Sequence, residues 1–198
     1  MISDIFKPAV VRVISPTARG LLRIGLTPNS VTFIGAVGVV TTALIAYPAG
    51  HLFGGTLLIC VMALSDLFDG TMARISDRGP SRWGGFLDST IDRVTDSAIA
   101  VGLLIYLAKA DDLLAYPLLV SMVAGFLVSY IRAKAESLDI ECKGGFAERT
   151  ERLIILLAAI GFTGLGVPYI LAVGTWFLAI VSIFTVMQRL LIVWKATK

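Results

Sequence analysis

Histidine and cysteine, the residues behind many catalytic and metal-binding sites, are scarce in this chain of 198 residues. It contains one histidine, His51, and two cysteines, Cys60 in an apolar stretch and Cys142 in a polar one. No CxxC pair and no Cys/His cluster occurs, which argues against a zinc site and against a disulfide framework. We interpret both cysteines as structural.

Charged residues are also few, at 16%, whereas 57% of the residues are hydrophobic and the mean hydropathy is +0.86. This composition excludes an ordinary water-soluble protein. The net charge is only +3 and no dense basic run occurs, so nucleic-acid binding is not indicated. Six spans of about 20 residues would use about 120 residues, which leaves no room for a separate soluble domain. We therefore expect one membrane domain over residues 1–198, with any chemistry inside it.

Hydropathy predicts six transmembrane helices separated by turns rich in Gly, Pro and Asp. The predicted spans are about 31–48, 52–75, 84–108, 113–137, 150–166 and 169–194. Apolar and basic residues alternate over about residues 1–25, which predicts a helix lying along the membrane surface and not a signal peptide. The expected fold is all-α: a polytopic six-helix bundle over about 31–194, preceded by an interfacial amphipathic helix.

The positive residues predict the orientation of these spans. Of the 17 Lys and Arg residues, Lys109 is the only one on the side opposite the two termini. Positive residues are retained on the cytoplasmic side, so both termini are expected there, in a multi-pass protein of the cell membrane.

Four aspartates lie at membrane depth. The apolar part of the second span, Leu52 to Ser65, is only 14 residues long, or about 21 Å of helix against a hydrocarbon core of about 30 Å. Asp66 and Asp69 are then about 21 and 26 Å from the outer end, and Asp92 and Asp88 about 23 and 29 Å on the antiparallel third span. The spacings i, i+3 and i, i+4 give each helix one acidic face toward the cytoplasmic side.

A carboxylate at membrane depth costs roughly 2.5 to 3.5 kcal/mol, and four together also repel one another, so strong compensation is needed. Two divalent cations would provide it, and oxygen ligands without His or Cys favour Mg²⁺ or Mn²⁺. Salt bridges to nearby arginines are the structural alternative: Arg74, Arg78, Arg82 and Arg93. Asp96, one turn deeper, is expected to hold a partner or to pack. Gly70 and Ala73 reduce side-chain bulk beside Asp66 and Asp69, which suits a ligand or close helix packing.

Together, these residues resemble the signature of the CDP-alcohol phosphatidyltransferases, D-x2-D-G-x2-A-R-x8-9-G-x3-D-x3-D. All eight fixed positions match: Asp66, Asp69, Gly70, Ala73, Arg74, Gly84, Asp88 and Asp92. The resemblance extends over essentially the whole chain. It implies a membrane enzyme of phospholipid synthesis, expected to be a homodimer, that transfers a phosphatidyl group from CDP-diacylglycerol to a hydroxyl and releases CMP.

The resemblance also implies roles for individual residues. Asp66, Asp69 and Asp88 would bind the metal ions, and Asp92 would be the general base and a candidate ligand of the second ion. The donor-binding residues would be Asn29, Ser30, Val31, Thr32, Gly70, Ala73, Arg74 and Ser81. For Pro28-Asn29-Ser30, a plain helix cap is the alternative. His51, the one histidine, is expected at the opposite membrane face, so no Ser/His or Cys/His nucleophile pair is available. Direct displacement is therefore favoured over a covalent intermediate, although an aspartyl intermediate stays open.

Basic residues at the cytoplasmic ends of the later spans indicate an anionic acceptor, although positive-inside bias would also place some here. They are Arg132, Lys134, Arg149, Arg152 and Arg189. The segments SYIRAKAE and ERTERL resemble the phosphatidylinositol phosphate synthase branch, whose acceptor is inositol phosphate (1D-myo-inositol 3-phosphate). Phosphatidylglycerophosphate synthase, using glycerol 3-phosphate, is the near alternative.

Two more distant alternatives are an intramembrane prenyltransferase and a transporter. The former would not need Gly-x-x-Ala-Arg after the second aspartate, and transport sites usually lie near the membrane midplane between repeats. Release of CMP that depends on substrate would distinguish a phosphatidyltransferase from both alternatives.

Overall fold

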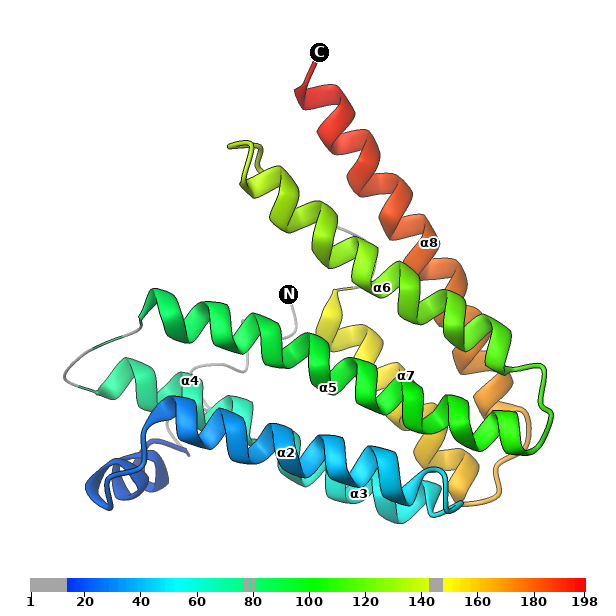
Figure 1. Ribbon diagram of the computed structural model, residues 1–198, viewed down its shortest axis with the longest axis horizontal. Helices are drawn as coiled ribbons and strands as arrows, with labels where there is room; N and C mark the ends of the chain where they lie inside the picture. Colours follow the sequence, from blue (N-terminus) through cyan, green and yellow to red (C-terminus); the bar gives the residue numbers. More distant parts are fainter. Residues whose placement is uncertain (1–13, 77–78, 80, 143–147) are drawn as a thin grey trace. The chain divides into compact units, whose positions relative to one another are not determined.

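The computed structural model describes residues 14–76, 79, 81–142 and 148–198, and within these ranges it has helices and no strand. The helices labelled in Figure 1 are, in chain order, α2 (Pro28–Ala46), α3 (Leu52–Ala63), α4 (Ser65–Ile75), α5 (Arg82–Lys109), α6 (Ala115–Glu136), α7 (Arg149–Gly164) and α8 (Ile170–Ala196). Residues 14–23 are also helical. The expected interfacial helix therefore has a helical second half, while residues 1–13 lie outside the described residues.

Every predicted span coincides with helix, so the all-α class is confirmed. The span predicted over 52–75 is two helices, because the chain tightens at Leu64 between α3 and α4. The Leu64 N–H donates to the carbonyl of Val61 (3.3 Å), and the Leu67 N–H donates to the carbonyl of Leu64 (3.0 Å). These bonds span three residues instead of four, which is 3₁₀ geometry, and the break falls where the apolar sequence ends and the acidic sequence begins.

In the described part of the chain, four helical stretches are long and apolar enough to cross a membrane: Pro28–Ala46, Leu52–Ile75, Ala115–Glu136 and Ile170–Ala196. In α5 the aspartates and arginines interrupt the apolar sequence, and α7 has 16 residues. Large apolar side chains are exposed along the outer faces of several helices, for example Phe33 on α2 and Trp176 on α8. Such surfaces suit hydrocarbon as the solvent, so the chain is a membrane protein.

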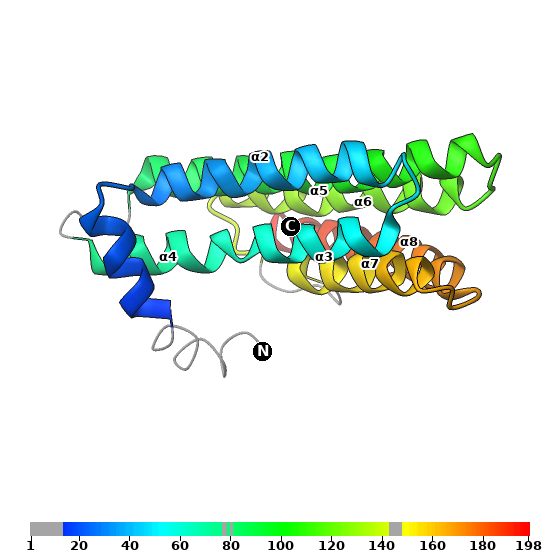
Figure 2. The same ribbon diagram turned by 90° about the horizontal axis from the view of Figure 1, so that it is seen from below.

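The described residues form two compact units. Unit 1 contains those of Met1–Thr42 and Leu57–Ala98, and unit 2 those of Ala43–Thr56 and Ile99–Lys198. Within unit 1, α2 runs beside α3 and α4 (Figure 2). Glycines permit this close approach, since a Cβ on Gly35 would lie 1.8 Å from Ser65 Oγ and one on Gly38 would lie 2.7 Å from Met62 Sδ.

Unit 2 is packed in the same way, with small residues at the helix contacts. A Cβ on Gly102 of α5 would lie 2.1 Å from the carbonyl oxygen of Ala43, and one on Gly174 of α8 would lie 2.6 Å from the Cβ of Ala159. Helix α8 packs against both α6 and α7. The turn before α3 depends on Gly50, whose φ of 85° is one that L side chains rarely adopt.

Candidate active site

Helix α4 presents the acidic face that the sequence predicts. Asp66 lies in its first turn and Arg74 in its last, which matches the helix dipole at both ends. Asp66 is exposed, whereas Asp69 is buried and accepts a hydrogen bond from the hydroxyl of Thr32 on α2. Arg74 folds back along its own helix, its Nε donating to the carbonyl of Gly70 (2.9 Å), so it does not neutralise these aspartates by that contact.

Helix α5 carries the other two aspartates of the family signature. Asp88 is exposed and Asp92 is half-buried. Asp69 interacts electrostatically with both Asp66 and Asp88, so the structure brings carboxylates of α4 and α5 into the same region. Among the described residues, however, no three His, Cys, Asp or Glu side chains lie close enough together to hold a metal ion as they stand.

The donor set nevertheless fits a hard divalent cation. Its ligand atoms are carboxylate oxygens, which Mg²⁺ and Mn²⁺ prefer. At Gly70, directly after Asp69, the described residues place only Arg74 Nη2, at 3.6 Å, near a Cβ, so the helix backbone is accessible beside the carboxylates. Asp66, Asp69 and Asp88 remain the candidate ligands, and their metal binding stays a prediction.

The segment predicted to bind the donor forms the start of α2. Thr27 caps this helix: its Oγ1 accepts the Ser30 N–H (3.2 Å) and lies 2.8 Å from Ser30 Oγ, and Pro28 opens the helix. The helix-cap interpretation of this segment is thus confirmed, which leaves its donor role a prediction.

Ser81, another predicted donor residue, lies at the start of α5 beside the signature glycine Gly84. The Gly84 N–H donates to Ser81 Oγ (2.9 Å), which caps this helix. A Cβ on Gly84 would lie 3.1 Å from Ser81 Oγ and 3.6 Å from Asn29 Oδ1. The absence of a side chain at Gly84 therefore leaves Asn29 and Ser81 accessible to one another across the ends of α2 and α5. Val31 and Ala73, two more predicted donor residues, are half-buried.

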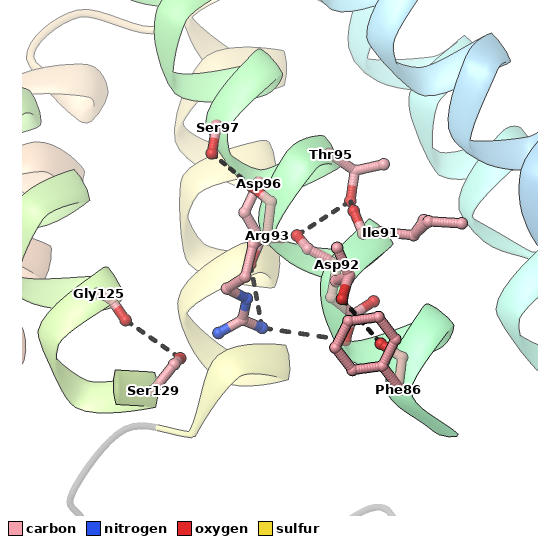
Figure 3. A network of polar contacts seen from close by, with 10 residues as sticks. Phe86, Ile91, Asp92, Arg93, Thr95, Asp96, Ser97, Gly125 and Ser129 are labelled. Carbon is pink, nitrogen blue, oxygen red and sulfur yellow. Dashed lines mark hydrogen bonds and ion pairs between the residues drawn. The ribbon is translucent and has the colours of Figure 1, made fainter. Parts of the chain in front are cut away.

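A network around Arg93 follows the acidic stripe of α5 (Figure 3). The Arg93 Nη2 lies 3.9 Å from Asp92 Oδ2 and 3.7 Å from Asp96 Oδ2. Asp96 thus holds a partner, as expected. The salt-bridge alternative applies in part, because Arg93 pairs with Asp92, the predicted base. The sequence named Arg93 among the arginines that could pair with the aspartates, and its spacing of three residues from Asp96 is a signal for that pair.

In unit 2, three of the predicted acceptor residues, Arg132, Arg152 and Arg189, lie on or beside α6. A Cβ on Gly125 would lie 3.9 Å from the Nε of Arg152, and the Nη1 of Arg189 donates to the carbonyl of Val128 (2.6 Å). Arg189 also interacts electrostatically with Arg132 and Glu136. The structure therefore brings together arginines from α6, α7 and α8, which are far apart in the sequence.

The remaining two acceptor candidates are placed differently. Lys134 follows Arg132 by two residues, which is about 200° around α6, so the two side chains leave the helix in opposite directions. Arg149 is half-buried in the first turn of α7, where Glu148 and Glu151 form a capping box. Arg132 itself is exposed and donates from Nε to Glu136 Oε1 (2.9 Å).

Comparison with known proteins identifies the family. A sequence model of the CDP-alcohol phosphatidyltransferases matches residues 25–192. The chain belongs to this family. Among its relatives in the CDP-alcohol phosphatidyltransferase family, the phosphatidylinositol phosphate synthase of Mycobacterium marinum is 44% identical over 195 residues, which cover 96% of this chain and 83% of that protein.

Solved structures of another CDP-alcohol phosphatidyltransferase are also similar. The phosphatidylinositol phosphate synthase of Mycobacterium tuberculosis with CDP-DAG bound matches with a TM-score of 0.88 and 42% identity, covering 92% of this chain and 94% of that chain. The same protein in complex with manganese and citrate matches with a TM-score of 0.87 and 42% identity, covering 91% and 88%. The resemblance seen in the sequence, to this family and to this branch, is therefore confirmed.

Proposed function

We propose that this protein is a phosphatidylinositol phosphate synthase. It transfers the phosphatidyl group of CDP-diacylglycerol to the hydroxyl of inositol phosphate (1D-myo-inositol 3-phosphate) and releases CMP. The observation that carries this proposal is the similarity, over nearly the whole chain, to synthases of that name, one of them solved with CDP-DAG bound. All eight positions of the family signature support it, because they supply the carboxylates that this chemistry needs.

Asp66, Asp69 and Asp88 are assigned as metal ligands, and Asp92 as general base and candidate ligand of a second ion. Mg²⁺ is the expected ion and Mn²⁺ the alternative, with two ions in the site. The manganese complex of the Mycobacterium tuberculosis protein and the all-oxygen donor set support this assignment. Divalent ions bound here supply charge neutralisation on the diphosphate.

The cytidine diphosphate part of the donor is assigned to the beginnings of α2 and α5 and to the small face of α4. The assigned residues are Asn29, Ser30, Val31, Thr32, Gly70, Ala73, Arg74 and Ser81. The proximity of Asn29 to Ser81 across Gly84 and the bare backbone at Gly70 support this placement. Arg74 provides a positive charge next to that backbone, and its unused guanidinium nitrogens are suited to a phosphate.

The acceptor's phosphate is assigned to Arg132, Lys134, Arg149, Arg152 and Arg189. Guanidinium groups bind phosphate oxygens in pairs, and the gathering of Arg132, Arg152 and Arg189 around α6 supports their part of the assignment. The opposite directions of Arg132 and Lys134 make Lys134 the weakest member. Arg132 donates to Glu136 and Arg189 to the Val128 carbonyl, contacts that hold these two guanidinium groups beside α6.

The proposed reaction is a direct displacement. Asp92 accepts the proton of the acceptor hydroxyl, whose oxygen forms a bond to the phosphorus that carries diacylglycerol. The bond from that phosphorus to the CMP oxygen breaks, and the electron pair leaves with CMP. Arg93 lies beside Asp92 and would hold its carboxylate in place. The products are phosphatidylinositol phosphate, CMP and a protonated Asp92.

We further propose that the whole chain is one domain with six transmembrane spans, an interfacial helix before them, and both termini and the active site on the cytoplasmic side. The distribution of Lys and Arg supports this orientation. A homodimer surrounded by membrane lipids is the expected assembly.

An acceptor panel tests the proposed function. The purified protein is given CDP-diacylglycerol with inositol phosphate, inositol, glycerol 3-phosphate or serine, and CMP and the lipid product are measured. We expect rapid CMP release with inositol phosphate and phosphatidylinositol phosphate as the product. Preference for glycerol 3-phosphate would instead identify a phosphatidylglycerophosphate synthase. If none of the four acceptors leads to CMP release, the transferase assignment is wrong.

A further inference from the structure

The buried contact between Thr32 and Asp69 joins two segments to which separate tasks were assigned. Thr32 lies in the first part of α2, in the predicted donor segment, and Asp69 lies on α4, in the predicted metal site. Both side chains are buried, at 6% and 7% exposure, and the Thr32 hydroxyl donates to Asp69 Oδ2. Both residues belong to unit 1.

Close packing of the two helices holds this contact in place. One turn after Thr32, Gly35 meets Ser65, and the next turn brings Gly38 against Met62. A Cβ at either glycine would collide with the side chain of Ser65 or Met62, so these side chains pack directly onto the α2 backbone and the helices lie close together. The Thr32 hydroxyl therefore reaches the carboxylate without any long, flexible side chain in between.

The hydroxyl has one proton and two possible acceptors. Besides Asp69 Oδ2, the carbonyl of Pro28 on its own helix lies 3.1 Å from Thr32 Oγ1. A hydrogen bond to a carboxylate is stronger than one to a neutral carbonyl. The carboxylate is thus the preferred acceptor, and the carbonyl is the alternative that a threonine in a helix always has.

We propose that Thr32 is a positioning residue for the metal ligand Asp69, an inference that rests on the proposed function. With Oδ2 held by the hydroxyl, rotation of the carboxylate is restricted and Oδ1 is presented as the ligand atom. Partners behind a metal ligand fix its orientation, and their loss commonly reduces metal affinity about 10- to 100-fold. Thr32 then serves the metal site through Asp69, whereas its assignment to the donor rested on the resemblance of its segment to that of the family.

The test compares Thr32→Val, which keeps the shape and removes the hydroxyl, with Thr32→Ser, which keeps the hydroxyl. Mn²⁺ binding to each purified protein is measured by electron paramagnetic resonance without any substrate, and the KM for CDP-diacylglycerol is measured at saturating Mn²⁺. Thr71→Val is the matched control, because Thr71 is also buried on α4 but its hydroxyl bonds to the Leu67 carbonyl of its own helix (2.8 Å).

We expect Thr32→Val to bind Mn²⁺ about 10- to 100-fold more weakly, with Thr32→Ser and Thr71→Val close to the unsubstituted protein. Unchanged Mn²⁺ affinity in Thr32→Val, or a raised KM for CDP-diacylglycerol as its main effect, would overturn the proposal and favour a direct donor contact. If Thr32→Val does not fold, Thr32→Ala removes the same hydroxyl and decides by the same criteria. Failure of the unsubstituted protein to bind Mn²⁺ would overturn the metal assignment itself, which distinguishes the two failures.

Discussion

Ionisable side chains within apolar helices need a polar or charged partner. At the residue scale, three side chains of this protein show which partners they have. Asp69 is buried beside the Thr32 hydroxyl, and Arg189 is buried with the Val128 carbonyl as acceptor. Arg93 lies between Asp92 and Asp96. Ionisable residues in membrane helices are rare because they are costly, and those that occur mark functional sites. The buried aspartate and the buried arginine are each flanked by further groups assigned to the same substrate or ion.

Replacement of Arg152 tests the acceptor assignment. Loss of one charge-assisted phosphate contact should cost roughly 1.5 to 3 kcal/mol, so Arg152→Gln should raise the KM for inositol phosphate about 10- to 150-fold where KM tracks binding. The KM for CDP-diacylglycerol should barely change. Steady-state kinetics with each substrate varied in turn measure both values.

Lys195→Gln is a suitable control, since Lys195 is an exposed cation in the last turn of α8 with no assigned contact to substrate. It should leave both KM values unchanged. If Arg152→Gln and Arg132→Gln instead raise the KM for the donor and spare the acceptor, the arginines around α6 serve the other substrate.

At the scale of the helices, small residues decide which pairs pack closely. Gly102 of α5 lies directly against the Ala43 carbonyl, and Gly164 of α7 lies against the backbone of Phe53, where a Cβ would be 2.3 Å from the amide nitrogen. In membranes, where burial of apolar surface gives little advantage between helices, such close contacts supply much of the packing energy. Substitution of these glycines should therefore affect stability more than their small size suggests.

Gly102→Ala provides the test. The added Cβ would lie 2.1 Å from a backbone oxygen that cannot move aside alone, so the helices must separate. We expect a loss of roughly 1 to 3 kcal/mol, seen as a lower apparent melting temperature in detergent. Gly54→Ala is the matched control, since nothing lies within 4 Å of its Cβ position, and it should melt as the unsubstituted protein does or slightly higher. Equal melting temperatures for the two variants would show that the Gly102 contact is not tight.

Which helical features could be predicted from the sequence follows from what each depends on. Apolar runs bounded by Pro48, Gly79 and Gly164 predicted the positions of the helices, because hydropathy and turn residues are local properties. The break at Leu64 was not predicted, since the sequence around it has neither proline nor glycine. It lies where α3 and α4 pack against α2 at Gly35 and Gly38, a tertiary contact that no local sequence pattern displays.

The candidate site also has features that the sequence predicts and features that depend on tertiary contacts. The eight signature positions identified the carboxylates and the family from spacing alone, and the comparisons confirm the family. The pairing of Thr32 with Asp69 and of Arg189 with Val128 links residues 37 and 61 positions apart, so no local pattern could indicate it. Lys134 was grouped with Arg132 by composition, although a spacing of two residues already places them on opposite sides of a helix.

At the scale of the whole molecule, the distribution of positive charge predicts the orientation. Lys109 stands alone on the predicted outer side, near the turn before α3, where its Nζ donates to the Pro48 carbonyl (2.9 Å). Both partners belong to the same predicted face of the membrane, as the six-span topology requires. Ser76, which follows α4, is expected on the other face.

Single cysteines report this orientation. In a background without Cys60 and Cys142, Lys109→Cys should react with a membrane-impermeant maleimide added to intact cells. Ser76→Cys should react only after the membrane is permeabilised. Labelling of Ser76→Cys from outside would contradict the cytoplasmic placement of the active site.

We propose that the four signature aspartates perform phosphatidyl transfer, and CMP release by Asp92→Asn is the decisive measurement. CMP formed from CDP-diacylglycerol, inositol phosphate and Mn²⁺ is measured beside Mn²⁺ affinity, with Asp69→Asn for comparison. We expect Asp92→Asn to bind Mn²⁺ nearly as well as the unsubstituted protein but to release no CMP, because the main role of Asp92 is proton removal. Asp69→Asn should lose Mn²⁺ affinity. CMP release by Asp92→Asn at the unsubstituted rate, or equal loss of Mn²⁺ affinity in the two variants, would contradict it.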